Sequence, residues 1–239
     1  MTPRLPPDNA RGSVGISRRD IEALMRLSTP RVCDALEHAA PERRAAGHTT
    51  RPLDCARPAL APVAGRARTA LVSTAAPCPS AVARHAAWLE HLASKPRPAI
   101  LVWQDIDGPD AIGACWDAAA AAAYKALGCL GLLTDGAVCG GQASPSDLQV
   151  LHRGHRPARG WLHIVAFGCE VSVAGMTVRD GDIVHVDRHG AVVVPEDALH
   201  DLPEVARGLR ARDAGLLAAC AAPGADIESL RPLLTRRYG

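Results

Sequence analysis

The stretch GACWDAAAAAAYKALGCLGLLTDGAV, residues 113–138, decides how this chain should fold. Alanine has the highest intrinsic helix propensity, so the alanine run predicts a helix that Asp117 can cap and that Gly128 ends. The apolar residues that follow Gly128 predict a buried strand, which ends in a Thr-Asp-Gly turn. Another buried strand is predicted at 98–107, before the helix. Strand, helix and strand in this order predict a parallel βαβ unit with a right-handed crossover.

The regions on either side of this unit are predicted to belong to the same single domain. Helices are predicted to begin near Ser17 and near Ser28, a further helix is predicted at 80–94, and short strands with Gly-rich turns follow from about residue 161. Residues 41–68 have the Pro- and Arg-rich composition of a loop, and a strand is predicted directly after them. A last helix is predicted from about 197 to 220. We therefore expect an N-terminal mobile arm (1–17), one α/β domain (18–220) and a C-terminal tail (221–239).

Composition excludes several classes of protein. The 239 residues carry a net charge of only +2 and few aromatic side chains, so neither a nucleic-acid surface nor a base-stacking platform is expected. No run of about eighteen apolar residues occurs, so no membrane span is expected. The eight cysteines form no CxxC motif and the N-terminus lacks an apolar core, which together predict free thiols in the cytoplasm.

Several spaced motifs in the same order resemble the RraA-like family. They are LSTPRVCDALE (27–37), the opening stretch at 113–138, VLHRG (150–154) and GDIVHVDRHGAVVVP (181–195), and the resemblance extends over roughly 18–200. The family contains 4-hydroxy-4-methyl-2-oxoglutarate aldolases, related oxaloacetate decarboxylases and a protein regulator of ribonuclease E. The resemblance implies a β/β/α swivelling-type domain with N-terminal helices and a C-terminal helix. It also implies self-association as a homotrimer or hexamer, with the site between subunits.

The chain departs from the family at the catalytic motif. The family aldolases carry an acidic residue, twenty intervening residues and then Arg-Asp, which hold a divalent metal and stabilise an enolate. An ungapped alignment places these positions on Ala118, Cys139 and Gly140, none of which can replace the original side chain. Mg²⁺ and Mn²⁺ require hard oxygen ligands, so no metal or other cofactor is expected at this site, and the usual retro-aldol route is not expected either.

The remaining pocket-forming groups give the candidate substrate-binding residues. Backbone N–H groups at a helix start bind anions, which predicts that Ala119 and Ala120, with the loop residues Gly140 and Gly141, hold a small anion or an acid similar to a 2-oxo acid. Arg153, Arg156 and Arg159 belong to a basic loop, which is either a solvated surface or a rim that attracts anions, and the solvated surface is the preferred interpretation.

Four side chains are candidates for acid–base chemistry, and each has a structural alternative. Cys139 is either a site thiol or a small residue in a relaxed loop, and Asp117 either reaches the pocket or only caps its helix. His163 lies on a predicted strand and is either an acid–base group or part of a structural hydrogen bond between strand and turn. His185 shares a strand face with Asp187, so the pair either orients a general base or forms a structural hydrogen bond.

Three functions remain open. The first is a divergent enzyme that acts on a small carboxylated or oxygenated metabolite by carbon–carbon lyase or decarboxylase-like chemistry. The second is a non-catalytic binding or regulatory protein of the RraA type, suggested by the lost motif. The third, ranked last, is a metal-dependent 4-hydroxy-4-methyl-2-oxoglutarate aldolase whose ligands come from elsewhere in the chain.

Overall fold

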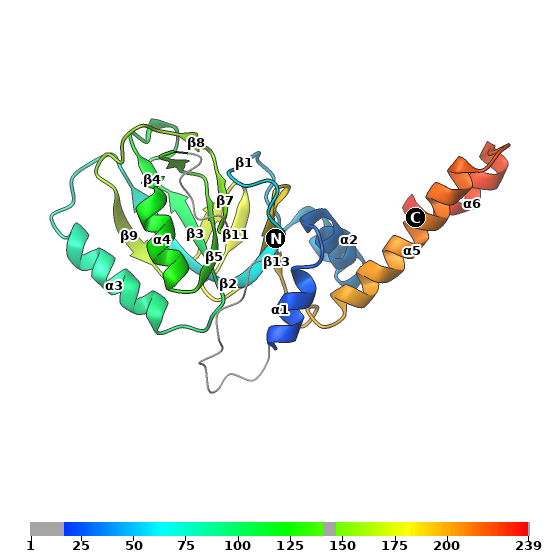
Figure 1. Ribbon diagram of the computed structural model, residues 1–239, viewed down its shortest axis with the longest axis horizontal. Helices are drawn as coiled ribbons and strands as arrows, with labels where there is room; N and C mark the ends of the chain where they lie inside the picture. Colours follow the sequence, from blue (N-terminus) through cyan, green and yellow to red (C-terminus); the bar gives the residue numbers. More distant parts are fainter. Residues whose placement is uncertain (1–16, 141–146, 239) are drawn as a thin grey trace.

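The computed structural model describes residues 17–140 and 147–238, which form a mixed α/β fold around one curled sheet (Figure 1). The helices are α1 (Arg18–Leu24), α2 (Thr29–Ala39), α3 (Ala81–Ala93), α4 (Ala118–Ala126), α5 (Leu202–Ala221) and α6 (Ile227–Tyr238), with 3-10 turns η1 (Pro41–Ala45) and η2 (Gly108–Asp110). The strands are β1 (Asp54–Cys55), β2 (Val63–Ser73), β3 (Ala99–Asp105), β4 (Ala114–Trp116), β5 (Cys129–Thr134), β6 (Ala137–Val138), β7 (Gln149–His152), β8 (Gly154–His155), β9 (His163–Phe167), β10 (Val171–Val173), β11 (Met176–Val178), β12 (Ile183–Asp187) and β13 (Gly190–Val194).

Strand β2 organises the main sheet. Seven strands run in the order β1-β7-β5-β3-β2-β12-β13, and β9 joins as an eighth by pairing with β2. The first residues of β2 pair antiparallel with β12 and its last residues pair antiparallel with β9, while its other edge pairs in parallel with β3. Strands β3, β5 and β7 continue the parallel part. The predicted parallel βαβ arrangement is therefore confirmed.

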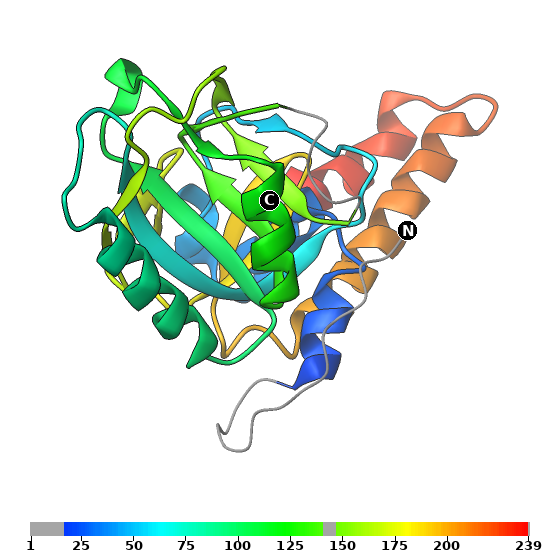
Figure 2. The ribbon, with the colours of Figure 1, turned by 60° about the vertical axis from the view of Figure 1, so that its left-hand side comes forward.

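Helices cover the sheet in two groups, each with its own core. Helices α3 and α4 lie over one face (Figure 2) and bury an aromatic-rich cluster that includes Trp88, Trp103 and Tyr124. Helices α1, α2 and α5 gather at the other end of the molecule, where an aliphatic cluster that includes Leu24 and Val184 fills the space. No helix in the described ranges is both long enough and apolar enough to cross a lipid bilayer.

The decisive stretch folds as a strand followed by a shorter helix than predicted. Residues 114–116 form β4, so α4 begins only after Asp117, whose carboxylate caps it. The helix ends before Gly128, which adopts a φ of 86° that favours glycine. Strand β2 also begins at Val63, within the segment predicted as a loop, because its first residues complete the pairing with β12.

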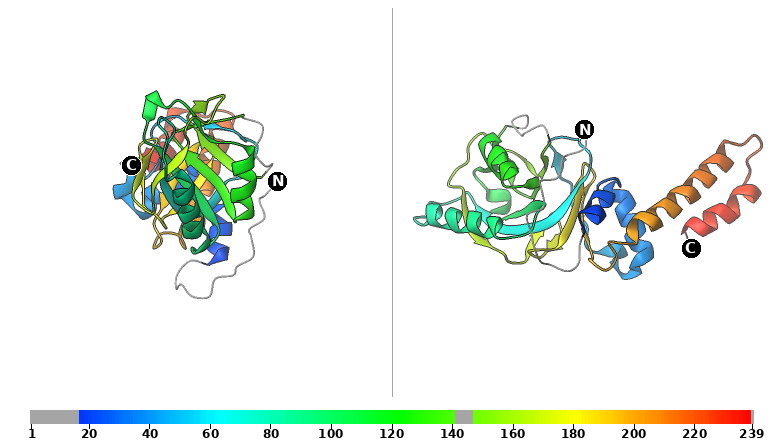
Figure 3. Two further views of the ribbon diagram at one scale, coloured as in Figure 1. Left: turned by 90° about the vertical axis from the view of Figure 1, so that its left-hand side faces the viewer. Right: turned by 60° about the horizontal axis from the view of Figure 1, so that its bottom comes forward.

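The C-terminal residues differ from the predicted tail. Helix α5 projects from the domain, and α6 folds back beside it as a helical hairpin (Figure 3). The local signal is a capping box: the Ser229 N–H donates to the Asp226 carboxylate at 2.9 Å, and the Asp226 N–H donates to the Ser229 hydroxyl at 3.1 Å. The predicted N-terminal arm, apart from Ser17, lies outside the described residues.

Candidate functional site

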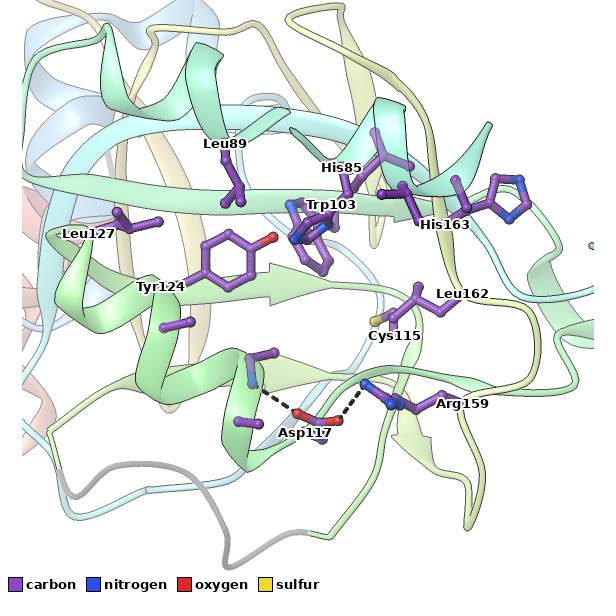
Figure 4. Close-up of a pocket in the computed structure, with 16 residues that line it drawn as sticks. His85, Leu89, Trp103, Cys115, Asp117, Tyr124, Leu127, Arg159, Leu162 and His163 are labelled. Carbon is purple, nitrogen blue, oxygen red and sulfur yellow. Dashed lines mark hydrogen bonds and ion pairs between the residues drawn. The ribbon is translucent and has the colours of Figure 1, made fainter. Parts of the chain in front are cut away.

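A pocket of about 670 Å³ lies between α3 and α4, over the parallel part of the sheet (Figure 4). Helix α3 contributes one wall, α4 the opposite wall, and β3 and β9 contribute Trp103 and Ile164. Most of the lining is apolar, and charged groups occur at one end. This size and character match pockets that take small organic molecules.

The apolar part of the pocket is built by aromatic side chains. The chain has only seven Phe, Trp and Tyr residues, and five of them pack together here: Trp88, Trp103, Trp116, Tyr124 and Phe167. Trp88 Nε1 donates to the Tyr124 hydroxyl at 2.9 Å and so joins α3 to α4, while burial raises the pKa of Tyr124. Trp103 lines the pocket with its ring, while its indole N–H is fully buried and has no hydrogen-bond partner among the described residues.

The polar end of the pocket is formed by Asp117 and Arg159. One Asp117 oxygen accepts the N–H of Ala120 at 2.9 Å, and the other lies 3.1 Å from the guanidinium of Arg159. Figure 4 shows both contacts at the start of α4. The Arg159 side chain is 63% exposed and that of Asp117 22% exposed, so the arginine can exchange this partner for a ligand while the aspartate stays held by the helix.

The backbone donors predicted for anion binding are partly in use. Ala119 and Ala120 do line the pocket. The N–H of Ala120, however, already donates to the carboxylate of Asp117, which caps α4. This carboxylate therefore occupies the position that was predicted to bind an anion. Arg159 is therefore the group at this end of the pocket that can bind a negatively charged ligand.

Cys139 lies beside the residues that precede α4. The N–H of Cys139 donates to the Trp116 carbonyl at 2.7 Å, and its thiol donates to the Pro157 carbonyl at 3.5 Å. The half-buried Cys139 and the exposed Gly140 are not among the residues that line the pocket between α3 and α4. Gly141 lies outside the described residues.

His163 lines the pocket at its rim. Its Nδ1 lies 2.8 Å from the carbonyl of Trp161, and Figure 4 shows the imidazole turned away from Trp103 and Tyr124. The side chain is half-buried, so rotation about its side-chain bonds can bring a ring nitrogen toward the pocket.

His185 lies far from this pocket, in the aliphatic core under α1 and α2. Its Nε2 lies 3.2 Å from the Leu24 carbonyl and 3.1 Å from the Leu27 carbonyl, and its Nδ1 lies 3.0 Å from the hydroxyl of Thr29. Burial lowers the pKa of His185 to about 4, so the ring is neutral at physiological pH. The geometry corrects the prediction that His185 belongs to the pocket and favours the structural alternative, because the ring ties two helices to the sheet.

Asp187, the partner predicted for His185, also makes structural hydrogen bonds. The carboxylate of Asp187 accepts the N–H of Thr29 at 2.8 Å and the N–H of His189 at 2.7 Å. The two side chains therefore meet at Thr29, where both fix the start of α2. This contact explains why they share a strand face without forming a catalytic pair.

Two pocket residues were not named as site residues from the sequence. Arg159 was placed in a basic loop, preferred as a solvated surface over an anion-attracting rim, and the return of that loop to α4 in three dimensions brings it to Asp117. Cys115 lines the pocket from β4, but complete burial raises the pKa of its thiol to about 12, which makes it an unreactive wall. No spacing rule in the sequence distinguishes either residue from its neighbours.

The residues at the family's metal position do not fit a divalent cation. Ala118, Cys139 and Gly140 supply no carboxylate, and hard cations bind through oxygen. Across the described ranges, no group of three or more His, Cys, Asp or Glu residues has a geometry that could hold a metal ion. No chemical step at this pocket is therefore derived from a metal.

Comparison with known proteins gives a family and a fold. Residues 29–193 match the family model RraA-like, described as Aldolase/RraA. An uncharacterized protein from Pseudomonas syringae pv. tomato str. DC3000 superposes with a TM-score of 0.69 at 19% identity, covering 93% of this chain and 98% of that one. RraAS2 of Streptomyces coelicolor, an unusual member of the RNase ES inhibitor RraA protein family, gives 0.65 at 20% identity, with 88% and 100% covered.

A shorter relative matches less of the chain. The RNA-processing inhibitor RraA from Thermus thermophilis gives a TM-score of 0.52 at 18% identity and covers 68% of this chain and 92% of that one. No curated protein matches the sequence. At these identities the superpositions establish the fold alone.

Proposed function

The chain belongs to the RraA-like family, and from this premise we propose that it is an enzyme acting on a small carboxylated metabolite by a lyase-type cleavage that does not use the family's metal motif. The observation that carries the proposal is the Asp117–Arg159 pair, 3.1 Å apart, at the charged end of an otherwise apolar pocket. It provides a guanidinium beside the start of α4, where the family motif has lost its own arginine.

Arg159 binds and activates the substrate in this proposal. A guanidinium matches the two oxygens of a carboxylate and adds a full positive charge. When a 2-oxo acid loses carbon dioxide from C3, the electron pair of the broken bond remains as an enolate. Loss of an aldehyde fragment leaves the same enolate, and His163 then first accepts the proton of the C4 hydroxyl group that becomes the aldehyde oxygen. The positive charge of Arg159 stabilises that oxyanion more strongly in the transition state than in the ground state.

Two other groups complete the site. Asp117 positions Arg159 before the substrate arrives. His163, at the rim, returns a proton to the enolate carbon after its ring rotates inward. The apolar walls exclude water and so strengthen each of these electrostatic contacts.

The test is a panel of small 2-oxo acids, each with Mg²⁺ and with EDTA, followed by measurement of pyruvate and carbon dioxide. The proposal expects turnover that persists in EDTA and falls by about 10²-fold or more in Arg159→Gln. Arg153→Gln is the matched control, because Arg153 is an exposed arginine of the same loop that does not line the pocket. Equal losses in both variants, or turnover only with metal, would refute the proposal.

A second candidate is a non-catalytic regulator, favoured by the absence of charged side chains at Ala118, Cys139 and Gly140. A protein of this kind would leave the whole panel unchanged and would slow RNA cleavage by a purified RNase E-type endonuclease. Of two structural relatives, RraAS2 of Streptomyces coelicolor belongs to an RNase ES inhibitor family, and RraA of Thermus thermophilis is described as an RNA-processing inhibitor. Turnover of any panel compound that depends on Arg159 would exclude this candidate.

We also propose that the protein acts in the cytoplasm as a homotrimer or a pair of trimers. All eight cysteines are free thiols, as a reducing compartment requires. Light scattering after size-exclusion chromatography measures the assembly directly. The expected mass is three or six times the 25.0 kDa of one chain, whereas a monomer at micromolar concentration would contradict the assembly.

A further inference from the structure

A second cleft, away from the pocket described above, is lined by four arginines. It has a volume of about 450 Å³ and lies among α1, α2 and α5, at the end of the molecule opposite α3 and α4 (Figure 1). Arg26 comes from the segment after α1, Arg31 from α2, and Arg207 and Arg210 from α5. We call this feature the arginine cleft.

Three of the four arginines in the arginine cleft carry a charge that no described residue neutralises. No carboxylate is among the described residues that line it. Arg31 is paired with Asp213 at 2.9 Å and with Asp34 at 3.5 Å, but Arg26, Arg207 and Arg210 form no hydrogen bond or ion pair with any described residue. Arg207 and Arg210 are three positions apart on one helix, which places like charges on the same face and costs free energy in the absence of a ligand.

Polar donors other than the guanidinium groups also line this cleft. Ser28 is the N-cap residue of α2, yet its hydroxyl forms no hydrogen bond with a described residue, so its O–H can donate to a ligand at the cleft wall. The contact with Asp213 holds the Arg31 guanidinium in place and leaves its other N–H groups for a second partner. Fixed donors reduce the entropic cost of binding an anion.

We propose that the arginine cleft binds a small polyanion with two or more adjacent oxyanion groups, either phosphates or carboxylates. Guanidinium groups match both chemistries through paired N–H···O contacts. The cleft volume lies in the range of sites for small molecules. A nucleic-acid strand is a poorer match, because the net charge is only +2 and Trp, Tyr and Phe are absent from the lining.

The proposal is tested by calorimetric titration of the full-length protein with inorganic diphosphate and, separately, with citrate. The key variant is Arg207→Gln with Arg210→Gln, and its matched control is Arg19→Gln with Arg231→Gln. The control pair removes the same charge from exposed arginines outside the cleft. Neither pair disturbs an internal contact, so both variants should keep the thermal stability of the wild type to within a few degrees.

Wild type and control should bind at least one of the two anions with the same affinity, and the cleft variant should bind at least about tenfold more weakly. The anion that binds more tightly identifies the source of the ligand as phosphate or carboxylate. The proposal is overturned if neither anion binds, if the control weakens binding as much as the cleft variant, or if a short single-stranded RNA binds the cleft more tightly than both anions.

Discussion

The pocket between α3 and α4 and the arginine cleft differ in how they manage charge. In the pocket, aromatic walls surround one ion pair, and Arg159 is already matched by Asp117. In the arginine cleft, three arginines have no partner within the described ranges, and no carboxylate lines the wall. The stability of the pocket between α3 and α4 therefore depends mainly on apolar packing and on the pre-formed ion pair. The arginine cleft, in contrast, needs a bound anion to neutralise its charge.

The largest expected effect comes from the aromatic side of this comparison. Trp88→Ala removes a fully buried indole and leaves the Tyr124 hydroxyl without its donor. Such large-to-small changes cost about 3–5 kcal/mol of the free energy of unfolding. Urea denaturation measures this loss, and a loss below about 1 kcal/mol would show that the pocket does not depend on aromatic packing.

The next effect concerns the histidine beneath the arginine cleft. His185 holds the carbonyl of Leu27, which lines the cleft, and its folded-state pKa is lowered to about 4. The unfolded chain therefore binds more protons between about pH 6.5 and pH 4, so the stability from the neutral ring is present above pH 6.5 and lost as the pH falls toward 4. The loss should reach about 2–3 kcal/mol.

Chemical denaturation at several pH values checks this prediction. His185→Gln should be less stable at pH 7 and should show a flatter profile between pH 6.5 and 4. Asp105 opposes the trend, because burial raises its pKa to about 6 and its protonated form adds stability that is lost as the pH rises through 6. Parallel profiles for wild type and His185→Gln would contradict the assignment.

A smaller effect separates the two contacts of Asp117. Asp117→Ala removes the cap of α4 and should lower the free energy of unfolding by about 1 kcal/mol. Asp117→Asn retains an oxygen for the Ala120 N–H and loses only the ion pair with the largely exposed Arg159, so its cost should stay below about 0.5 kcal/mol. Equal costs for the two variants would mean that the ion pair, rather than the cap, holds this end of the pocket.

The smallest effect is a gain in stability at the arginine cleft. Arg207→Gln with Arg210→Gln relieves like-charge repulsion and should raise the free energy of unfolding by about 0.2–0.5 kcal/mol in low salt. The gain should disappear in about 1 M salt, where the Debye length shortens to about 3 Å. Thermal unfolding in both conditions measures it, and a loss of stability in low salt would show that these arginines are neutralised in the free protein.

The fold was largely predictable because its local signals agree with its long-range pairing. The Asp117 cap, the alanine run and Gly128 locate α4 within a few residues, and the capping box of Ser17 and Asp20 locates α1. The start of β2 was not predictable, because residues 63–66 are drawn into the sheet by β12, more than a hundred residues away. Pairing at that distance leaves no local pattern in the sequence.

The sites were less predictable than the fold. Sequence spacing identified Asp117, Ala119 and His163, which do line the pocket, because helix starts and strand positions determine where these residues lie. It left Arg159 in a basic loop without placing it at the pocket and did not identify the arginine cleft, since both arise where loops and helices distant in the chain come together. His185 was assigned to the pocket because strand alternation gives the face of a residue but not what packs against that face.

The most direct test of the central claim is a crystal structure of the protein grown with Mg²⁺ and oxalate, a mimic of the pyruvate enolate. We predict oxalate in the pocket between α3 and α4, with its oxygens within hydrogen-bonding distance of the Arg159 guanidinium. We predict no cation beside Cys139 or Gly140. Magnesium seated next to Gly140, with oxalate bound to the metal and Arg159 still paired only with Asp117, would contradict it.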